Sequence, residues 1–269
     1  MPESQLNLDR AFSAAVSAGK AAGAIQKELF GTDIEIGYKG RIDVVTNVDL
    51  QCEREIIRII HSEYPDHTIL AEEESQKPKE SKCKWIIDPL DGTVNFAHGF
   101  PLFSSSIALE VEGNVVLGVV YDPIRDELFT GKRGGGAFLN GQPIYVSGTD
   151  KLEQSLLATG FSYHIREIKN NNLDHFGRFA FRAQSIRRAG SATLDLSYVA
   201  MGRFDGFWEM NLFPWDMAAA SLILEEAGGE LSLTNGDPFS LYRNEIIGSN
   251  GLIHREMVEV LKLGLKQSD

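Results

Sequence analysis

The stretch that most constrains this chain is WIIDPLDGTVNF, residues 85–96, in which an apolar run ends abruptly in two acids. The first three residues are typical of a buried strand. Asp88 and Asp91 follow within four positions, so two carboxylates stand at the end of that strand, where they lose hydration and repel each other. A turn, a neighbouring Lys or Arg, or a metal ion must compensate their charges.

The simplest interpretation of the two acids is a turn. In Asp-Pro-x-Asp-Gly the Asp side chains accept backbone N–H groups, Pro fixes φ, and Gly adopts dihedral angles that other residues avoid. Taken alone, such a stretch is more often a turn than a functional site. The remainder of the chain favours a second interpretation.

Composition limits the classes of function. The chain has 269 residues, 43% of them hydrophobic, which is typical of a globular protein with a sizeable core. A formal net charge of −12 disfavours nucleic-acid binding, which needs a basic surface. Cys52 and Cys83 are the only cysteines, so neither a disulfide framework nor a zinc motif is expected. No membrane span and no signal peptide are evident, and we therefore predict a cytoplasmic protein without membrane or nucleic-acid partners.

Helical and strand patterns fill the first half of the chain. We expect helices over 8–30 and from a capping box at Thr46–Asp49 to Pro65, strands over 67–70, 85–87 and 127–132, two more within 103–122, a polar loop over 75–84, and hairpin turns at 112–114 and 140–141.

The second half alternates more regularly. We expect strands over 155–159, 185–188, 204–209, 230–233 and 245–249, and helices near 172–181, 191–201, 214–227 and 253–265. No repeat, low-complexity tract or linker separates the two halves, about 1–150 and 151–269. The pattern predicts one domain over 1–269, a layered chain of the α/β or α+β class.

Acids gather at the ends of predicted elements in three separate segments. They are Glu72 and Glu73 after the strand TIL, Asp88 and Asp91 after WII, and Asp216 at the start of a helix. Each has a structural explanation, such as a solvated loop or a favourable helix dipole. Together they favour a metal site, because Mg²⁺ prefers carboxylate oxygens and substrate phosphate. Two such ions can stabilise both the attacking and the leaving oxygen of a phosphoryl transfer.

The turn after WII offers further groups. Leu90 presents its main-chain carbonyl between the two acids, and Gly92 and Thr93 offer N–H groups to a phosphate where the next helix begins. The Thr93 hydroxyl can orient a water molecule if Asp49 receives the proton. Asp49 also has a purely structural interpretation, as the capping-box partner of Thr46.

The segment WIIDPLDGTVNFAHGFP resembles the signature of the inositol monophosphatase family of Mg²⁺-dependent, lithium-sensitive phosphatases. RRAGSATLDLSYVAMGRFDGFWE (187–209) and PWDMAAASLILEEAGG (214–229) also fit that family, and the resemblance covers essentially the whole chain. It implies an α/β sandwich of alternating helix and sheet layers, as in inositol monophosphatases and fructose bisphosphatases. It also implies a homodimer.

The resemblance implies a role for each site residue. Two or three Mg²⁺ ions would be held by Glu72, Asp88, the Leu90 carbonyl, Asp91 and Asp216. The attacking water would be activated by Asp49 and Thr93, with Glu73 beside the first metal. The substrate would be bound by the amides of Gly92 and Thr93, by Gly190, Ser191, Ala192 and Glu209, and by a basic residue, for which Lys39 is preferred over Arg41.

The implied activity is hydrolysis of myo-inositol monophosphate, a small phosphorylated polyol, to inositol and phosphate by a metal-activated water. A same-family phosphatase acting on histidinol phosphate, fructose 1,6-bisphosphate or a nucleotide 3′-phosphate is the first alternative. A non-catalytic metal-binding regulatory protein is the second, and the complete set of acids argues against it. Glu74 departs from the family pattern, which often has a small residue after the Glu pair.

Overall fold

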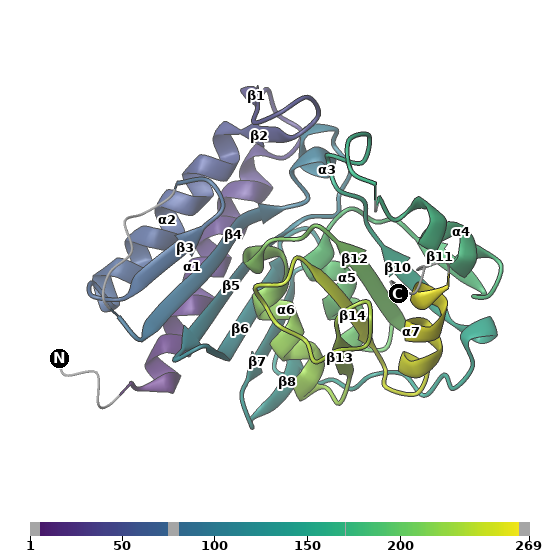
Figure 1. The fold of residues 1–269 in the computed structure, drawn as a ribbon. Coiled ribbons are helices and arrows are strands. Elements are labelled where there is room, and N and C mark those ends of the chain that lie inside the picture. The colour runs from purple at the N-terminus through teal and green to yellow at the C-terminus, as the bar shows by residue number, and fades with distance from the viewer. Residues whose placement is uncertain (1–5, 75–80, 170, 264–269) are drawn as a thin grey trace.

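The structure is a computed structural model that describes residues 6–74, 81–169 and 171–263. Its helices are α1 (Leu8–Leu29), α2 (Asn47–Glu63), α3 (Thr93–Ala97), α4 (Leu173–Ala180), α5 (Ala192–Ala200), α6 (Pro214–Glu226) and α7 (His254–Lys262). Within these ranges, α1 and α2 cover one face of a seven-stranded sheet, and α5 and α6 lie between it and a five-stranded sheet (Figure 1). Helices α4 and α7 cover the outer face of the five-stranded sheet. The predicted sandwich of alternating layers is confirmed.

The seven-stranded sheet carries the WIIDPLDG segment near one edge. Its strands, in spatial order, are β3 (Thr68–Ala71), β4 (Cys83–Asp91), β5 (Ser104–Val111), β6 (Asn114–Asp122), β7 (Glu127–Lys132), β8 (Gly136–Leu139) and β9 (Gln142–Pro143). Only β3 and β4 among them run parallel. Asp88 pairs with Ser106 and Asp91 with Ser104, so the register shifts between the two acids. Pro89, which has no N–H to donate, lies in this bulge, and the bulge turns the acids away from the regular ladder.

The five-stranded sheet has the order β11 (Ser185–Arg187), β10 (Leu156–Thr159), β12 (Gly206–Met210), β14 (Glu245–Ser249) and β13 (Glu230–Ser232). Successive residues of β12 point to opposite faces. Phe207 packs in the core that contains α5 and α6, and Trp208 packs in the core under α4 and α7. Glu209, two residues after Phe207, therefore faces the inner layer.

Helix α6 joins the two halves of the chain. It packs on β5, β6 and β7 of the first half, and its apolar residues lie in the core between the sheets. The approach is close because Gly118 lies under it: a Cβ at Gly118 would be 2.5 Å from the Ala219 carbonyl oxygen. This packing fixes the beginning of α6, where Asp216 lies, relative to the end of β4.

Several predicted boundaries are corrected. Of the predicted polar loop over 75–84, residues 75–80 lie outside the described ranges, and Cys83 and Lys84 belong to β4. The last helix ends at Lys262, before the predicted 265, and residues 264–269 are not described. A short hairpin of β1 (Ile36–Tyr38) and β2 (Val44–Thr46) was not predicted, because β1 is fully exposed and carries no burial pattern. A 3₁₀ turn, η2 (Leu152–Gln154), precedes β10.

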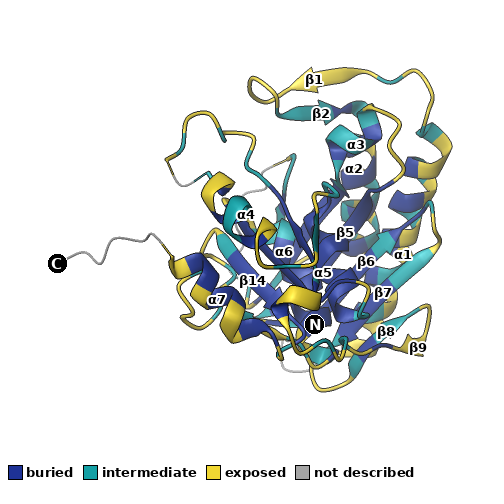
Figure 2. Cartoon of the chain, turned by 90° about the vertical axis from the view of Figure 1, so that its right-hand side faces the viewer, coloured by how far each residue is buried: buried dark blue, intermediate teal, exposed yellow. Residues whose placement is uncertain are grey.

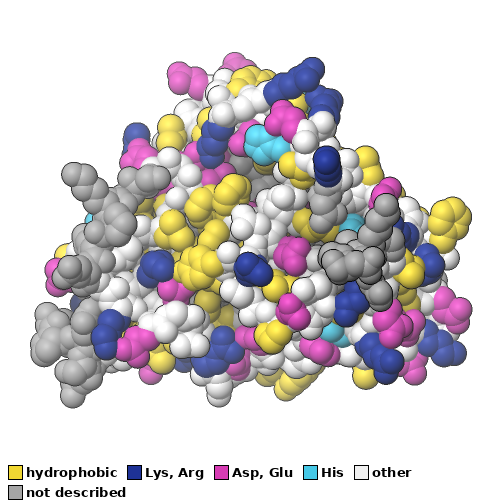
Figure 3. Space-filling model, in the orientation of Figure 1, with side chains coloured by type: hydrophobic (Ala, Val, Ile, Leu, Met, Phe, Trp, Pro, Cys, Tyr) yellow, Lys and Arg dark blue, Asp and Glu magenta, His cyan; other side chains and the backbone are white. Residues whose placement is uncertain are grey.

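Burial follows the layers. The strands of the large sheet and helices α5 and α6 are mostly buried, whereas α1, α2 and α7 each expose one side (Figure 2). On the face seen in Figure 3, acidic and basic side chains are interspersed. No helix in the described part of the chain is long and apolar enough to cross a membrane. Cys52 and Cys83 are buried free thiols.

Candidate active site

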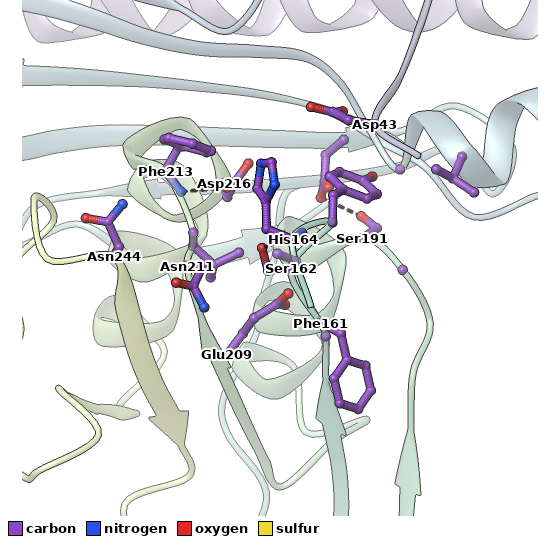
Figure 4. Close-up of a pocket in the computed structure, with 18 of the residues that line it drawn as sticks. Asp43, Phe161, Ser162, His164, Ser191, Glu209, Asn211, Phe213, Asp216 and Asn244 are labelled. Carbon is purple, nitrogen blue, oxygen red and sulfur yellow. Dashed lines mark hydrogen bonds between the residues drawn. The ribbon is translucent and has the colours of Figure 1, made fainter. Parts of the chain in front are cut away.

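The predicted site segments meet at one cavity of about 430 Å³. It lies where β3 and β4 end and where α5 and α6 begin, and β12 forms part of its wall (Figure 4). Its lining includes eight of the residues predicted from the sequence: Glu72, Asp91, Gly92, Gly190, Ser191, Ala192, Glu209 and Asp216. Of the other predicted residues, Lys39 pairs with Glu72 and Glu73, and a chain of hydrogen bonds joins Asp49, Thr93, Leu90 and Asp88.

Asp91 ties the end of β4 to the beginning of α5. Its Oδ2 accepts hydrogen bonds from Ser191 Oγ at 2.6 Å, from the Thr193 amide at 2.8 Å and from Thr193 Oγ1 at 2.5 Å. Ser191 is also the N-cap of α5. The turn interpretation fits Asp88, whose Oδ1 accepts the Leu90 amide, but not Asp91, whose donors lie 100 and 102 residues further along the chain. Thr193 was not predicted from the sequence, where it is one of several hydroxyl residues in a helical run.

Asp88 has less compensation. It is 2% exposed, and its Oδ1 accepts one hydrogen bond, from the Leu90 amide at 3.0 Å. Burial and the negative charges of Glu72, Asp91 and Asp216 hold its pKa well above the usual value. Burial, and after it the charges of Glu72, Asp91 and Glu209, raises the pKa of Asp216. Asp216 accepts the Phe213 amide in the first turn of α6. Carboxyls from three segments thus lie close enough to repel one another.

Asp49 and Thr93 form the pair predicted to activate water. Thr93 Oγ1 lies 2.8 Å from Asp49 Oδ1 and 3.0 Å from the Leu90 carbonyl oxygen. A hydroxyl has one hydrogen, so the two acceptors compete for it. The other Asp49 oxygen accepts the Thr46 amide and hydroxyl, at 2.8 Å and 2.5 Å. Asp49 is therefore both the capping-box residue of α2 and the partner of Thr93, and burial raises its pKa.

Lys39 lies among the acids of the site. Its Nζ is 2.9 Å from Glu72 Oε1 and 2.6 Å from Glu73 Oε1. Burial raises the pKa of both glutamates to about 7, and the Lys39 charge opposes that rise. The main chain behind them is held by Glu53, which accepts the amides of Glu73 and Glu74 and was not predicted from the sequence. Lys39 thus contacts the predicted metal-binding acids, whereas its predicted role was substrate binding.

Gly92 and Gly190 form the tight part of the cavity wall. Gly92 caps α3 with φ of 96°, and a Cβ there would be 3.0 Å from the Leu102 carbonyl oxygen and 3.3 Å from that of Gly190. The two predicted substrate-binding turns therefore contact each other. Residues with side chains have no space at Gly92.

A second group of ionisable residues forms another wall of the cavity. Glu209 is 9% exposed, and burial raises its pKa to about 8, against the charge of Arg188. Its carboxylate takes the space beside Gly160, where a Cβ would be 2.1 Å from Glu209 Oε1. Asp195 and Arg188 also line the cavity. Neither was assigned a role from the sequence, although a lone acid in the apolar run TLDLSYVA is a signal for a special environment.

The donor set suits a hard dication by ligand type and by charge. All predicted ligands are oxygen atoms, and their mutual repulsion is what a cation would relieve. As the side chains stand, no three His, Cys, Asp or Glu side chains in the described ranges are arranged to hold a metal ion. Two reasons are visible: Lys39 pairs with Glu72, and one oxygen of Asp91 already accepts three hydrogen bonds. A bound metal would compete with these contacts for the Glu72 and Asp91 carboxylates.

Comparison with known proteins gives one consistent answer about the fold. A protein 45% identical over 249 residues, covering 92% of this chain and 87% of its own, is the inositol-1-monophosphatase of Synechocystis sp.. A protein 42% identical over 239 residues, covering 87% of this chain and 90% of its own, is the Nus factor SuhB of Escherichia coli. The solved structure of an inositol monophosphatase from Anabaena superposes with a TM-score of 0.87 at 40% identity, covering 95% of this chain and 96% of that one.

The family assignment rests on the length of the match as well as on these relatives. The family profile described as the inositol monophosphatase family matches residues 7–263, which include the site residues named above. The chain belongs to the inositol monophosphatase family.

Proposed function

We propose that this chain is a Mg²⁺-dependent phosphomonoesterase that hydrolyses myo-inositol monophosphate to inositol and phosphate. The observation that carries the proposal is the convergence of Glu72, Asp91 and Asp216 on one cavity, with Asp88 buried close to all three, together with the Asp49–Thr93 hydrogen bond. A solved relative 29% identical to this chain, with a TM-score of 0.79, is described as bound to inositol monophosphate.

In this proposal Glu72, Asp88, the Leu90 carbonyl, Asp91 and Asp216 hold two or three Mg²⁺ ions. When bound, the ions supply positive charge that polarises the phosphate and favours an ionised water. A solved relative 26% identical to this chain is described as a complex with NADP and Ca²⁺, which supports divalent-cation binding by this fold. Lys39 contacts Oε1 of Glu72, so Glu72 would hold a metal through its other carboxylate oxygen unless Lys39 moves away.

The chain's own residues handle the proton. Thr93 Oγ1 donates to Asp49 Oδ1, which leaves the hydroxyl lone pairs free to accept a hydrogen bond from water. As the water attacks, its proton passes to Thr93 and the Thr93 proton passes to Asp49. The raised pKa of Asp49 makes it a better proton acceptor than an exposed aspartate. No Ser, Cys or His is required as a covalent nucleophile.

The substrate contacts are proposed from the family resemblance: the amides of Gly92 and Thr93 bind the phosphate, and Gly190, Ser191, Ala192 and Glu209 contact the leaving group. All of these residues except Thr93 line the cavity, which supports the proposal. Glu73 supports the metal-binding acids by sharing Lys39 with Glu72. We also propose, from the family, that the chain is lithium-sensitive and forms a homodimer.

A nucleoside phosphate is the second candidate substrate. Phe213 and Trp215 stack with ring centroids 5.0 Å apart, line the cavity, and Phe213 is 51% exposed. A flat base could stack on the exposed Phe213 face. A solved relative 30% identical to this chain is described as bound to 2′AMP.

A substrate panel tests the proposal. Phosphate release is measured from myo-inositol 1-phosphate, 2′-AMP, histidinol phosphate, fructose 1,6-bisphosphate and p-nitrophenyl phosphate, with Mg²⁺ and with EDTA. The proposal expects Mg²⁺-dependent release with the highest kcat/KM for inositol phosphate. If another ester gives a higher kcat/KM, that ester replaces myo-inositol monophosphate as the proposed substrate. If no ester releases phosphate, the phosphatase assignment is refuted.

A further inference from the structure

One acid of the cavity wall, Asp195, has a carboxyl oxygen without a hydrogen-bond partner in the part of the chain that the structure describes. Asp195 lies in the first turn of α5, is 1% exposed, and its Oδ1 has no hydrogen-bond partner within the described residues. The Asp195 side chain nevertheless lines the cavity. A buried carboxyl oxygen without a donor destabilises a fold, so its retention beside a ligand cavity indicates that a ligand supplies the donor.

Asp195 lies close enough to Glu209 for the two carboxyl groups to repel each other when ionised. Burial, and after it the charge of Glu209, holds the pKa of Asp195 well above the usual value. Arg188, at the same cavity, opposes the rise for both acids. No hydrogen bond to the Glu209 carboxyl is found in the part of the chain that the structure describes. Two neighbouring carboxyls from α5 and β12 therefore offer acceptors that the protein itself does not use.

The chemistry of this pair favours hydroxyl groups over a cation. Burial raises the pKa of Glu209 to about 8, so its carboxyl is partly protonated near neutral pH and donates as well as accepts hydrogen bonds. Hydroxyl groups do the same. A cationic leaving group would need ionised carboxylates and would also meet the positive charge of Arg188.

We propose that Asp195 is a second hydroxyl acceptor beside Glu209, so that two neighbouring hydroxyl groups of the leaving group are bound together; the Glu209 contact itself belongs to the proposed function. The inference deepens the proposed phosphatase function and rests on it. Asp195 is in this account a specificity-determining residue, positioned by the same helix start that Asp91 holds in place.

The test compares two substrates across matched variants. For Asp195→Ala, kcat/KM for myo-inositol 1-phosphate should fall about 10-fold more than kcat/KM for p-nitrophenyl phosphate, which has no hydroxyl groups. Asp195→Asn should lose less, because an amide still bonds to hydroxyls. The Tm of Asp195→Ala should not fall, since Oδ1 has no hydrogen-bond partner among the described residues. In the double variant Asp195→Ala/Glu209→Ala, the fold-loss of kcat/KM for myo-inositol 1-phosphate should be smaller than the product of the fold-losses of the two single variants.

Asp205→Asn is the matched control for a buried acid with a structural role. Asp205 accepts the Ser147 hydroxyl and the Leu156 amide, both at 2.6 Å, so its replacement should lower the Tm and leave the ratio of the two substrates unchanged. If Asp195→Ala behaves in the same way, with equal losses on both substrates, Asp195 supports only the fold and the proposal is wrong.

The wild-type enzyme provides an independent measurement. Inositol phosphates that lack one or the other of two adjacent hydroxyls should both show a lower kcat/KM than myo-inositol 1-phosphate. O-phosphoethanolamine should be a poor substrate. The proposal is overturned if removal of only one of the two hydroxyls lowers kcat/KM, or if O-phosphoethanolamine is the preferred substrate. If p-nitrophenyl phosphate is not hydrolysed with Mg²⁺ either, it is the phosphatase function that fails.

Discussion

At the scale of single residues, Asp88 occupies a position that water scarcely reaches and that three other carboxyls influence. Its one hydrogen bond, from the Leu90 amide, can be kept by an asparagine. Asp91 differs, because three hydrogen bonds from Ser191 and Thr193 compensate its charge. The two acids of the same turn therefore respond differently to loss of charge.

Asp88→Asn should stabilise the metal-free protein by about 1 kcal/mol, since it removes a charge that the fold disfavours. For a chain of this size that corresponds to a rise in Tm of roughly 2–4 °C, measured by calorimetry in EDTA. Asp91→Asn is the control, and its Tm should not rise, because a charge-assisted acceptor is lost. A lower Tm for Asp88→Asn would show that the local repulsion is already compensated.

At the scale of elements, α6 positions Asp216 by packing on the large sheet at Gly118. A Cβ at this position would lie 2.5 Å from the Ala219 carbonyl oxygen and 2.9 Å from its Cα, so the helix must move to admit it. Gly118→Ala should destabilise the fold by about 1–3 kcal/mol, as overpacked cores do. It should also lower the phosphatase kcat/KM, because the displaced helix carries Asp216.

The matched control is Gly148→Ala, where nothing lies within 4 Å of the added Cβ. Its Tm and activity should stay close to those of the wild-type protein. Urea unfolding of both variants gives the comparison. Equal stability of the two would mean that α6 is free to shift, and that the close packing at Gly118 does not position Asp216.

The sequence predicts long or strongly patterned elements and misses those set by tertiary contacts. The capping box at Thr46 and Asp49 begins α2, and the Asn140–Gly141 turn joins β8 to β9, because both signals are local. The β1–β2 hairpin was missed because its residues carry no apolar periodicity. The bulge in β4 depends on pairing with β5, which no local pattern reveals.

The residues of the candidate site also fall into those that the sequence predicts and those that depend on tertiary contacts. The acids near WII and Asp216 were found because they interrupt apolar runs or follow a family signature. The partners that hold them, Thr193 for Asp91 and Glu53 for the Glu73 amide, depend on contacts 102 and 20 residues apart. The roles of the metal-binding and substrate-binding residues remain predictions, as do the dimer and the cellular compartment.

At the scale of the whole molecule, buried acids make stability depend on pH near neutrality. Burial raises the pKa of Glu72 and Glu73 to about 7 and that of Glu209 to about 8, whereas each titrates near 4.5 when unperturbed. Between these values the folded chain binds more protons than the unfolded chain, so the free energy of unfolding falls as pH rises. Burial lowers the pKa of His175 and His254 from the usual 6.5. These two histidines make the free energy of unfolding rise with pH, but only up to about pH 6.5.

The Tm of the metal-free protein should therefore fall between pH 6.5 and pH 8, by several degrees at the roughly 2–4 °C per kcal/mol expected for this size. Glu209→Gln should reduce the fall, because it removes the group with the highest of the three values. Mg²⁺ should reduce it as well if it binds the acids. A Tm that stays constant or rises over this interval would contradict the account of these buried carboxyls.

The central claim is that the converging acids form a Mg²⁺-dependent phosphatase site. The most direct test is phosphate release from myo-inositol 1-phosphate as a function of Mg²⁺ concentration, for the wild-type protein and for Asp88→Asn. The account predicts no release in EDTA, saturable release with Mg²⁺, and a loss of at least about 100-fold in the variant, equivalent to about 2.7 kcal/mol. Release that is independent of Mg²⁺, or wild-type turnover by Asp88→Asn, would contradict it.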